Sequence, residues 1–140
     1  MKDDFVSSGR AISDLKAHLV LTTKYRKKLF TGAMITRLSE VFTDLCEKWN
    51  CKVIEFNGEE EHIHLLFQYL PQMDLSKFVN NLKSVSSRRV RAEFADEVNK
   101  VYWKSVLWNE SYFIASCGGV TVSVLKKYIG DYQEIIDPIA

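Results

Sequence analysis

The 140-residue sequence has only three cysteines and a net charge close to zero. The first feature argues against a disulfide-stabilised or zinc-knuckle protein, and the second against a strongly basic nucleic-acid-binding protein. Its three cysteines, Cys46, Cys51 and Cys117, are odd in number and none follows Cys-x-x-Cys spacing, which argues against a disulfide framework or a zinc knuckle. We expect small core residues in a reducing compartment. The net charge of +1 gives no global argument for nucleic-acid binding, so any basic surface must be local.

Long apolar runs are also missing. No N-terminal stretch has the apolar length of a signal peptide, and no other stretch approaches the length of a membrane span. The sequence therefore predicts a cytoplasmic protein that does not associate with membranes. Residues 1–13 mix charge, Ser and Gly without periodicity, and we expect a flexible N-terminal arm there. Residues 14–140 have the length and apolar content of a single domain.

Hydrophobic periodicity predicts alternating strands and helices along this domain. The expected strands are 15–24, 51–56, 61–70 and 111–117, and the expected helices are 32–49, 75–94 and 120–136. The order β-α-β-β-α-β, followed by one more helix, is that of an α+β ferredoxin-like fold. Such a fold has a four-stranded antiparallel sheet with helices on one face, and its other face is open to do chemistry.

The connections carry turn and anchor signals. Asn57-Gly58 predicts a hairpin turn between the second and third strands, in a connection that the acidic residues Glu59, Glu60 and Glu61 lengthen. Residues 95–110 are expected to form a connector whose aromatics, Tyr102, Trp103 and Trp108, anchor it to the core.

The third strand contains the pattern His62-Ile63-His64. Side chains alternate along a strand, so the two histidines share one face while Ile63 and Leu65 point into the core. Same-face residues lie about 6.5 Å apart, which lets two imidazoles lean onto one metal ion. The alternative is a pair of buried, hydrogen-bonded histidines. His18, in the first strand, has no close partner in the sequence pattern, and we expect a structural role for it.

Two local clusters of basic residues are the candidate nucleic-acid contacts. The run at 24–28 follows the first strand, and the second cluster lies on the helix at 75–94. A solvated, charged face is the alternative for both clusters. The candidate residues are Lys24, Arg26, Lys27, Lys83, Arg88 and Arg89, with Lys126 and Lys127 in the last helix.

Four local patterns coincide in order and spacing: HIHLL at 62–66, LWNESYF at 107–113, ASCGG at 115–119 and KKYI at 126–129. Together they resemble the single-tyrosine HUH transposases of the insertion sequence 200/605 class, over nearly the whole chain. The resemblance implies a homodimer that acts on single-stranded DNA at hairpin-bearing element ends. It also implies a nucleophilic tyrosine on the last helix, here Tyr128, that completes the partner subunit's site.

The implied chemistry agrees with the residues present. A phenol can hold a cut DNA end covalently as a 5′-phosphotyrosine, which preserves the energy for rejoining. A divalent ion, Mg²⁺ or Mn²⁺ by the resemblance, would polarise the phosphate and stabilise the leaving 3′ oxygen. The resemblance makes His62 and His64 two of its ligands.

The third ligand departs from the family pattern, which has Gln four residues after the tyrosine. Here position 132 is Tyr and the glutamine is Gln133. On a regular helix five residues turn about 140° from Tyr128, so Gln133 would face away unless Gly130 permits a bulge. Asp131 is the other candidate. Glu61 also stands where Asp is commoner, and we expect it on the face opposite the histidines.

Two other functions remain open at this point. One is a non-catalytic or domesticated module of the same fold that binds single-stranded DNA or RNA hairpins, which the displaced glutamine favours. The other is a small metal-dependent hydrolase that uses His-x-His, and it leaves the tyrosine helix unexplained.

Overall fold

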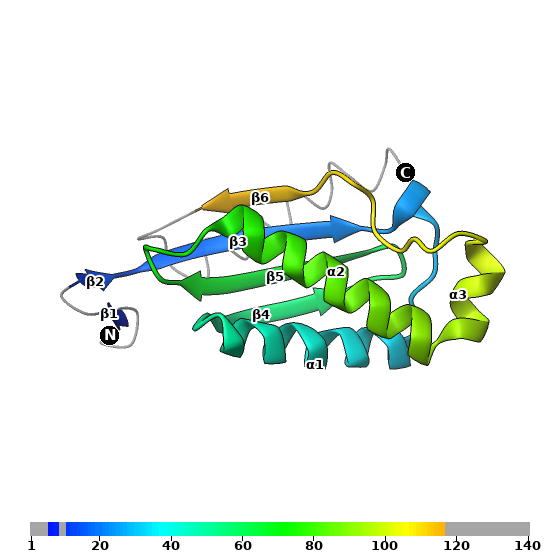
Figure 1. Ribbon diagram of the computed structural model, residues 1–140, viewed down its shortest axis with the longest axis horizontal. Coiled ribbons are helices and arrows are strands. Elements are labelled where there is room, and N and C mark those ends of the chain that lie inside the picture. Colours follow the sequence, from blue (N-terminus) through cyan, green and yellow to red (C-terminus); the bar gives the residue numbers. More distant parts are fainter. Residues whose placement is uncertain (1–5, 9–10, 117–140) are drawn as a thin grey trace.

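A four-stranded antiparallel sheet organises the computed structural model, which describes residues 6–8 and 11–116 of the chain. Its strands are β3 (Leu15–Thr22), β4 (Lys52–Gly58), β5 (His62–Tyr69) and β6 (Phe113–Ser116). They lie in the order β4-β5-β3-β6, and every neighbouring pair is antiparallel (Figure 1). This strand order, together with helices between β3 and β4 and between β5 and β6, confirms the predicted ferredoxin-like fold.

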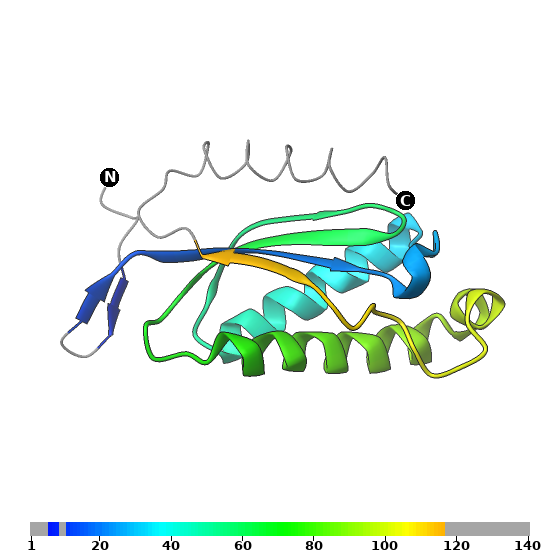
Figure 2. The ribbon, with the colours of Figure 1, turned by 90° about the horizontal axis from the view of Figure 1, so that it is seen from above.

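Two long helices cover one face of the sheet, as Figure 2 shows. They are α1 (Gly32–Lys48) and α2 (Leu75–Glu93), and both begin where the sequence predicts. Thr31 caps α1 by accepting a hydrogen bond from the Met34 amide at 3.2 Å, and Asp74 caps α2 by accepting one from the Lys77 amide at 3.1 Å. Each cap satisfies an amide that the helix itself leaves without a partner.

The hydrophobic core lies between these helices and the sheet. On β5 the core side chains are Ile63, Leu65 and Phe67, the alternate residues that the sequence predicts. The two helices contribute Met34, Leu38, Val41, Phe42, Leu45, Cys46, Phe78, Val79, Leu82 and Val90. Cys46 is buried and Cys51 is half-buried; both are free thiols, and burial raises each pKa to about 12, so they are inert core residues.

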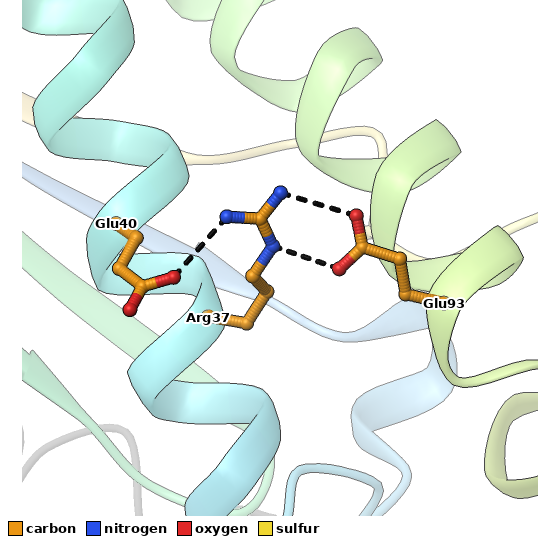
Figure 3. Close-up of polar contacts among 3 residues, drawn as sticks. All are labelled: Arg37, Glu40 and Glu93. Carbon is orange, nitrogen blue, oxygen red and sulfur yellow. Dashed lines mark hydrogen bonds and ion pairs between the residues drawn. The ribbon is translucent and has the colours of Figure 1, made fainter.

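The two helices are also joined at their surface by Arg37 of α1. Its guanidinium donates to both carboxylate oxygens of Glu93 on α2, at 2.7 and 3.1 Å, and to Glu40 at 3.1 Å (Figure 3). Hydrogen bonding to Arg37 lowers the pKa of Glu93. The pair is solvent-exposed, so it orients the helices more than it stabilises them.

Three local predictions are wrong. Asn57-Gly58 is not a turn: β4 continues through Gly58, and the connection lies at Glu59–Glu61, where the Glu59 amide donates to the His62 carbonyl at 2.8 Å. Gly58 packs closely against α1, because a Cβ there would lie 2.7 Å from Cγ2 of Ile35 and the Ile35 side chain would have to shift. The connector predicted at 95–110 contains a helix, α3 (Ala95–Val101), and the last strand begins two residues later than predicted.

Within the N-terminal region, β1 (Val6–Ser8) and β2 (Ala11–Ser13) pair as a short antiparallel hairpin. The flexibility expected for residues 1–13 stays a prediction. The division into an arm and a domain at residue 14 stays a prediction. The predicted helix at 120–136 and Cys117 lie outside the described residues. No helix of the described part of the chain is long and apolar enough to cross a membrane.

Candidate functional site

The face of the sheet that points away from α1 and α2 carries all three histidines. Directly paired residues on neighbouring strands share a face, and so do residues two apart on one strand. His18 pairs with Leu66, which is two residues from His64 on β5. His18 on β3 therefore lies on the same face as His62 and His64 on β5. The three side chains are 0%, 2% and 4% exposed, so this histidine face is buried rather than open.

His18 contacts His64 directly, which corrects the expectation that it has no close partner. Nε2 of His18 lies 3.2 Å from Nδ1 of His64, and the two rings stack with their centroids 5.5 Å apart. Phe113 of β6 meets His18 edge-on. Burial, and then the neighbouring His64, lower the pKa of His18 to about 4. A neutral His18 can accept a hydrogen bond from Nδ1 of His64 when His64 carries its proton on that nitrogen.

His62 and His64 lie together as the alternation predicts. Their ring centroids are 5.0 Å apart and the rings are nearly perpendicular, at 87°. Two imidazoles in such a pair are suitable nitrogen donors for a divalent transition metal. Within residues 6–8 and 11–116, no three His, Cys, Asp or Glu side chains gather into a metal site. The histidine pair thus fits part of a coordination shell, and a further donor would have to come from elsewhere.

Glu61 reaches the histidines, contrary to the expectation that it lies on the opposite face. Its Oε1 is 3.5 Å from Nδ1 of His62, and its Oε2 is 3.9 Å from the Arg26 guanidinium. Carboxylates beside Nδ1 commonly orient metal-binding histidines. Glu61 therefore connects the histidine pair to the basic segment that follows β3.

That basic segment is the 3₁₀ turn η2 (Lys24–Arg26), which has an unusual backbone. Tyr25 and Arg26 have φ angles of 60° and 53°, in the left-handed region that non-glycine residues rarely adopt. The turn is held by the Lys24 amide, which donates to the Leu107 carbonyl at 2.8 Å, and by the Tyr102 hydroxyl, which donates to the Lys24 carbonyl at 2.5 Å. Such a strained and well-anchored turn is typical of functional sites.

The two basic clusters predicted from the sequence come together in a groove to which each cluster contributes one lysine. Lys24 of η2 and Lys83 of α2 line the same groove, and proximity to Lys24 contributes, after burial, to lowering the Lys83 pKa. Nζ of Lys83 donates to the Glu110 carbonyl at 2.9 Å. Arg88 and Arg89 do not line this groove: Arg88 donates to Ser84 at 2.7 Å, and Arg89 lies near Glu93.

The aromatics of the connector divide into two groups. Tyr102 and Trp108 are buried anchors, as expected; the Trp108 indole donates to Ser86 Oγ at 2.9 Å. Trp103 is instead 89% exposed, so its predicted anchoring role is wrong. It is a candidate contact residue that sequence reasoning missed, and the neighbouring Lys104 was the available signal. Tyr25, in contrast, lies within the basic run at 24–28 that the sequence already marks as a candidate contact.

The remaining predicted site residues lie outside the described part of the chain. They are Tyr128, Asp131, Gln133, Lys126 and Lys127.

Comparison with known proteins shows the family. The family model described as "Transposase IS200 like" matches residues 11–132. The chain is 30% identical over 125 residues to the ISDra2 transposase TnpA of Deinococcus radiodurans, covering 89% of each protein. It is 31% identical over 114 residues to the IS200 transposase of Salmonella typhimurium, covering 81% of this chain and 74% of that protein.

Solved structures agree with the fold. A crystal structure of a Deinococcus radiodurans protein assigned as a transposase matches with a TM-score of 0.71 at 25% identity, over 90% of this chain and 95% of that chain. A REP-associated tyrosine transposase bound to a REP hairpin matches with a TM-score of 0.59 at 10% identity, over 88% of this chain and 68% of that chain, and shows the fold alone. The chain belongs to the IS200-like transposase family, as the sequence motifs predict.

Proposed function

We propose that this transposase cuts and rejoins single-stranded DNA at the ends of an insertion sequence through a covalent 5′-phosphotyrosine. The observation that carries the proposal is the placement of His62 and His64, which share one sheet face in a chain of this family. Tyr128, which follows Lys126 and Lys127 in the family's pattern, is the proposed nucleophile.

The reaction balances without water. The Tyr128 phenol loses its proton and its oxygen bonds to the scissile phosphorus. The bond from phosphorus to the 3′ oxygen breaks, and the departing oxygen takes up one proton to become a 3′ hydroxyl. Attack by a 3′ hydroxyl on the phosphotyrosine reverses these steps and joins two ends. Energy is retained in the phosphotyrosine ester, so no further cofactor has to supply it.

His62 and His64 are the proposed protein ligands of a divalent metal, Mg²⁺ or Mn²⁺. Both rings turn Nδ1 toward a neighbour in the chain, Glu61 for His62 and His18 for His64, so we assign Nε2 as the ligating atom of each. When bound, the ion supplies charge stabilisation at the phosphate and the leaving 3′ oxygen. Asp131 or Gln133 is the proposed third ligand. Imidazole donors favour Mn²⁺ over Mg²⁺.

The proposed substrate is single-stranded DNA that carries hairpins. A structural neighbour of the same fold was solved bound to a REP hairpin, and the candidate contacts on this chain are Lys24, Lys83 and the lysines that precede Tyr128. Each phosphate contact on a single strand adds about 0.7 to the slope of log affinity against log salt. We therefore expect binding that weakens steeply as salt is raised.

We also propose a homodimer whose sites are shared between subunits. Among the strands that the structure describes, β4 and β6 are the edges of the four-stranded sheet, and edge strands need covering or pairing. In the proposed dimer, Tyr128 of one chain reacts beside His62 and His64 of the other, as the resemblance implies.

Incubation with labelled single-stranded element ends and Mn²⁺ tests the function. We expect a protein–DNA adduct that survives a denaturing gel and disappears when the metal is chelated. A non-catalytic hairpin-binding module would retard the DNA on a native gel but give no adduct. Hydrolysis by a metal-bound water would give cut DNA without an adduct, so either result contradicts the proposal.

A further inference from the structure

Among the described residues, only two large hydrophobic side chains are strongly exposed, and both line one groove. Tyr25 is 73% exposed and Trp103 is 89% exposed. They come from segments far apart in the sequence, η2 and the stretch after α3, and they line a groove of about 760 Å³. Exposed aromatics that share one concave surface usually mark a binding site.

The charge of this groove is complementary to nucleic acid. Lys24, Lys27 and Lys104 line it, and none of the described residues that line it is acidic. Two of the lysines sit against the aromatic rings: Nζ of Lys24 is 5.3 Å from the Tyr25 ring centre, and Nζ of Lys104 is 5.0 Å from that of Trp103. A base stacked on either ring would have a cation within reach of its phosphate.

Hydrogen bonds join the two segments that line the groove, and one of these segments follows Thr23, which contacts Glu61. The bonds between the segments run from Tyr102 to Lys24 and from Lys24 to Leu107. Lys24 also lines the second groove, of about 340 Å³, which contains Lys83. At the same end of the sheet, the Thr23 amide donates to the Glu61 carbonyl at 2.9 Å, and the Glu61 side chain contacts His62.

We propose that the groove defined by Tyr25, Trp103 and the three lysines, here called the aromatic groove, binds unpaired bases of single-stranded DNA. The bases stack on Trp103 and Tyr25, while Lys24, Lys27 and Lys104 contact phosphates. Proteins that bind single strands combine a positive groove with such stacking rings. Duplex DNA is excluded because its bases already stack on each other. The choice of DNA as the ligand rests on the proposed function. Binding in the aromatic groove does not depend on the proposed cleavage reaction.

Binding measured without cleavage tests the aromatic groove. The probes are fluorescein-labelled oligothymidine of about 16 nucleotides and the same backbone with abasic sites in place of the bases, both in chelator. Trp103→Ala is expected to weaken binding of oligothymidine about 5- to 150-fold, because stacking on an aromatic contributes about 1–3 kcal/mol per base. Trp103→Phe should retain most of the affinity. Both variants should bind the abasic strand as the unsubstituted protein does.

The salt dependence of binding tests the contribution of the lysines in the aromatic groove. Lys104→Gln should lower the slope of log affinity against log salt by about 0.7, whereas Lys48→Gln, at the end of α1 and outside both grooves, should not change it.

Fluorescence of Trp103 gives a further test. Oligothymidine should quench it, and the abasic strand should not. Trp103→Phe should remove this change, because the other two tryptophans lie away from the groove: Trp108 is buried and Trp49 lies against Phe78.

Three results would overturn the proposal for the aromatic groove. The first is equal affinity of Trp103→Ala and the unsubstituted protein for oligothymidine. The second is that Trp103→Ala loses as much affinity for the abasic strand as for oligothymidine, and the third is that the unsubstituted protein binds oligouridine at least tenfold more tightly than oligothymidine. Failure of the proposed function is a separate result. It would be the absence of any covalent adduct from the unsubstituted protein, whatever the effect of Trp103 on binding.

Discussion

Nε2 of His18 lies 3.2 Å from Nδ1 of His64, although the two residues are 46 positions apart. The contact joins the first strand of the sheet to the strand that carries the proposed metal ligands. Since His18 does not need to touch the metal or the DNA, we regard it as a positioning residue for His64.

The first prediction concerns this contact. His18→Leu removes the acceptor for the His64 Nδ1 proton, so we expect a 10- to 100-fold higher Mn²⁺ requirement for adduct formation. His18→Gln retains an acceptor and should recover much of the loss. A manganese titration of adduct yield measures both variants, with circular dichroism as the folding control. Unchanged titrations for both variants would remove His18 from the site.

His62→Ala and His64→Ala should each abolish metal-dependent adduct formation while hairpin binding persists. Both side chains are buried, so each substitution should also lower the free energy of unfolding by about 1–3 kcal/mol. Urea denaturation separates this stability effect from the loss of chemistry. Full adduct formation at limiting Mn²⁺ by either folded variant would argue against its ligand role.

Tyr128→Phe should eliminate the covalent adduct and leave hairpin affinity nearly unchanged, because the substitution removes only the nucleophilic oxygen. Tyr132→Phe is the matched control, since residues four apart share one face of a helix. Mass spectrometry of the DNA-linked peptide identifies the tyrosine directly. A phosphotyrosine at position 132 would transfer the role of nucleophile to that residue.

Mixing two inactive variants tests the shared site. A heterodimer of Tyr128→Phe and His64→Ala chains contains one intact Tyr128 and one intact His64 on different chains. If each site combines residues of both subunits, such heterodimers should regain about one working site each. With every site inside a single chain, the mixture would stay as inactive as its two components. Adduct yield after co-refolding is the measurement.

Ser86→Ala should destabilise the fold through Trp108. Ser86 is fully buried on α2 and its Oγ accepts the Trp108 indole hydrogen at 2.9 Å. Leaving that N–H without a partner costs about 1–3 kcal/mol of unfolding free energy. Ser84→Ala, at an exposed position on the same helix, should change it by less than about 0.5 kcal/mol. Equal unfolding curves for the two variants would contradict this account.

The sequence by itself determined the four strands of the sheet, the two long helices α1 and α2, and the two faces of β5. Local alternation places Ile63 and Leu65 in the core and His62 and His64 on the other side, because the side-chain period of a strand does not depend on its neighbours. Helix starts were predictable for the same reason, since the Thr31 cap bonds an amide only three residues away.

Only the tertiary structure decided which distant residues meet. His18 reaches His64 because β3 pairs with β5 in one register, and that register is set by packing of the whole core. Lys24 and Lys83 share a groove, and Trp103 joins Tyr25 in another, because the connector after α3 folds back onto η2. The Asn57-Gly58 pair favoured a turn, yet both residues pair with β5, Asn57 with His64 and Gly58 with Ile63, and remain within β4. Such non-local contacts leave no periodic signal in the chain, because each depends on how separate elements pack together.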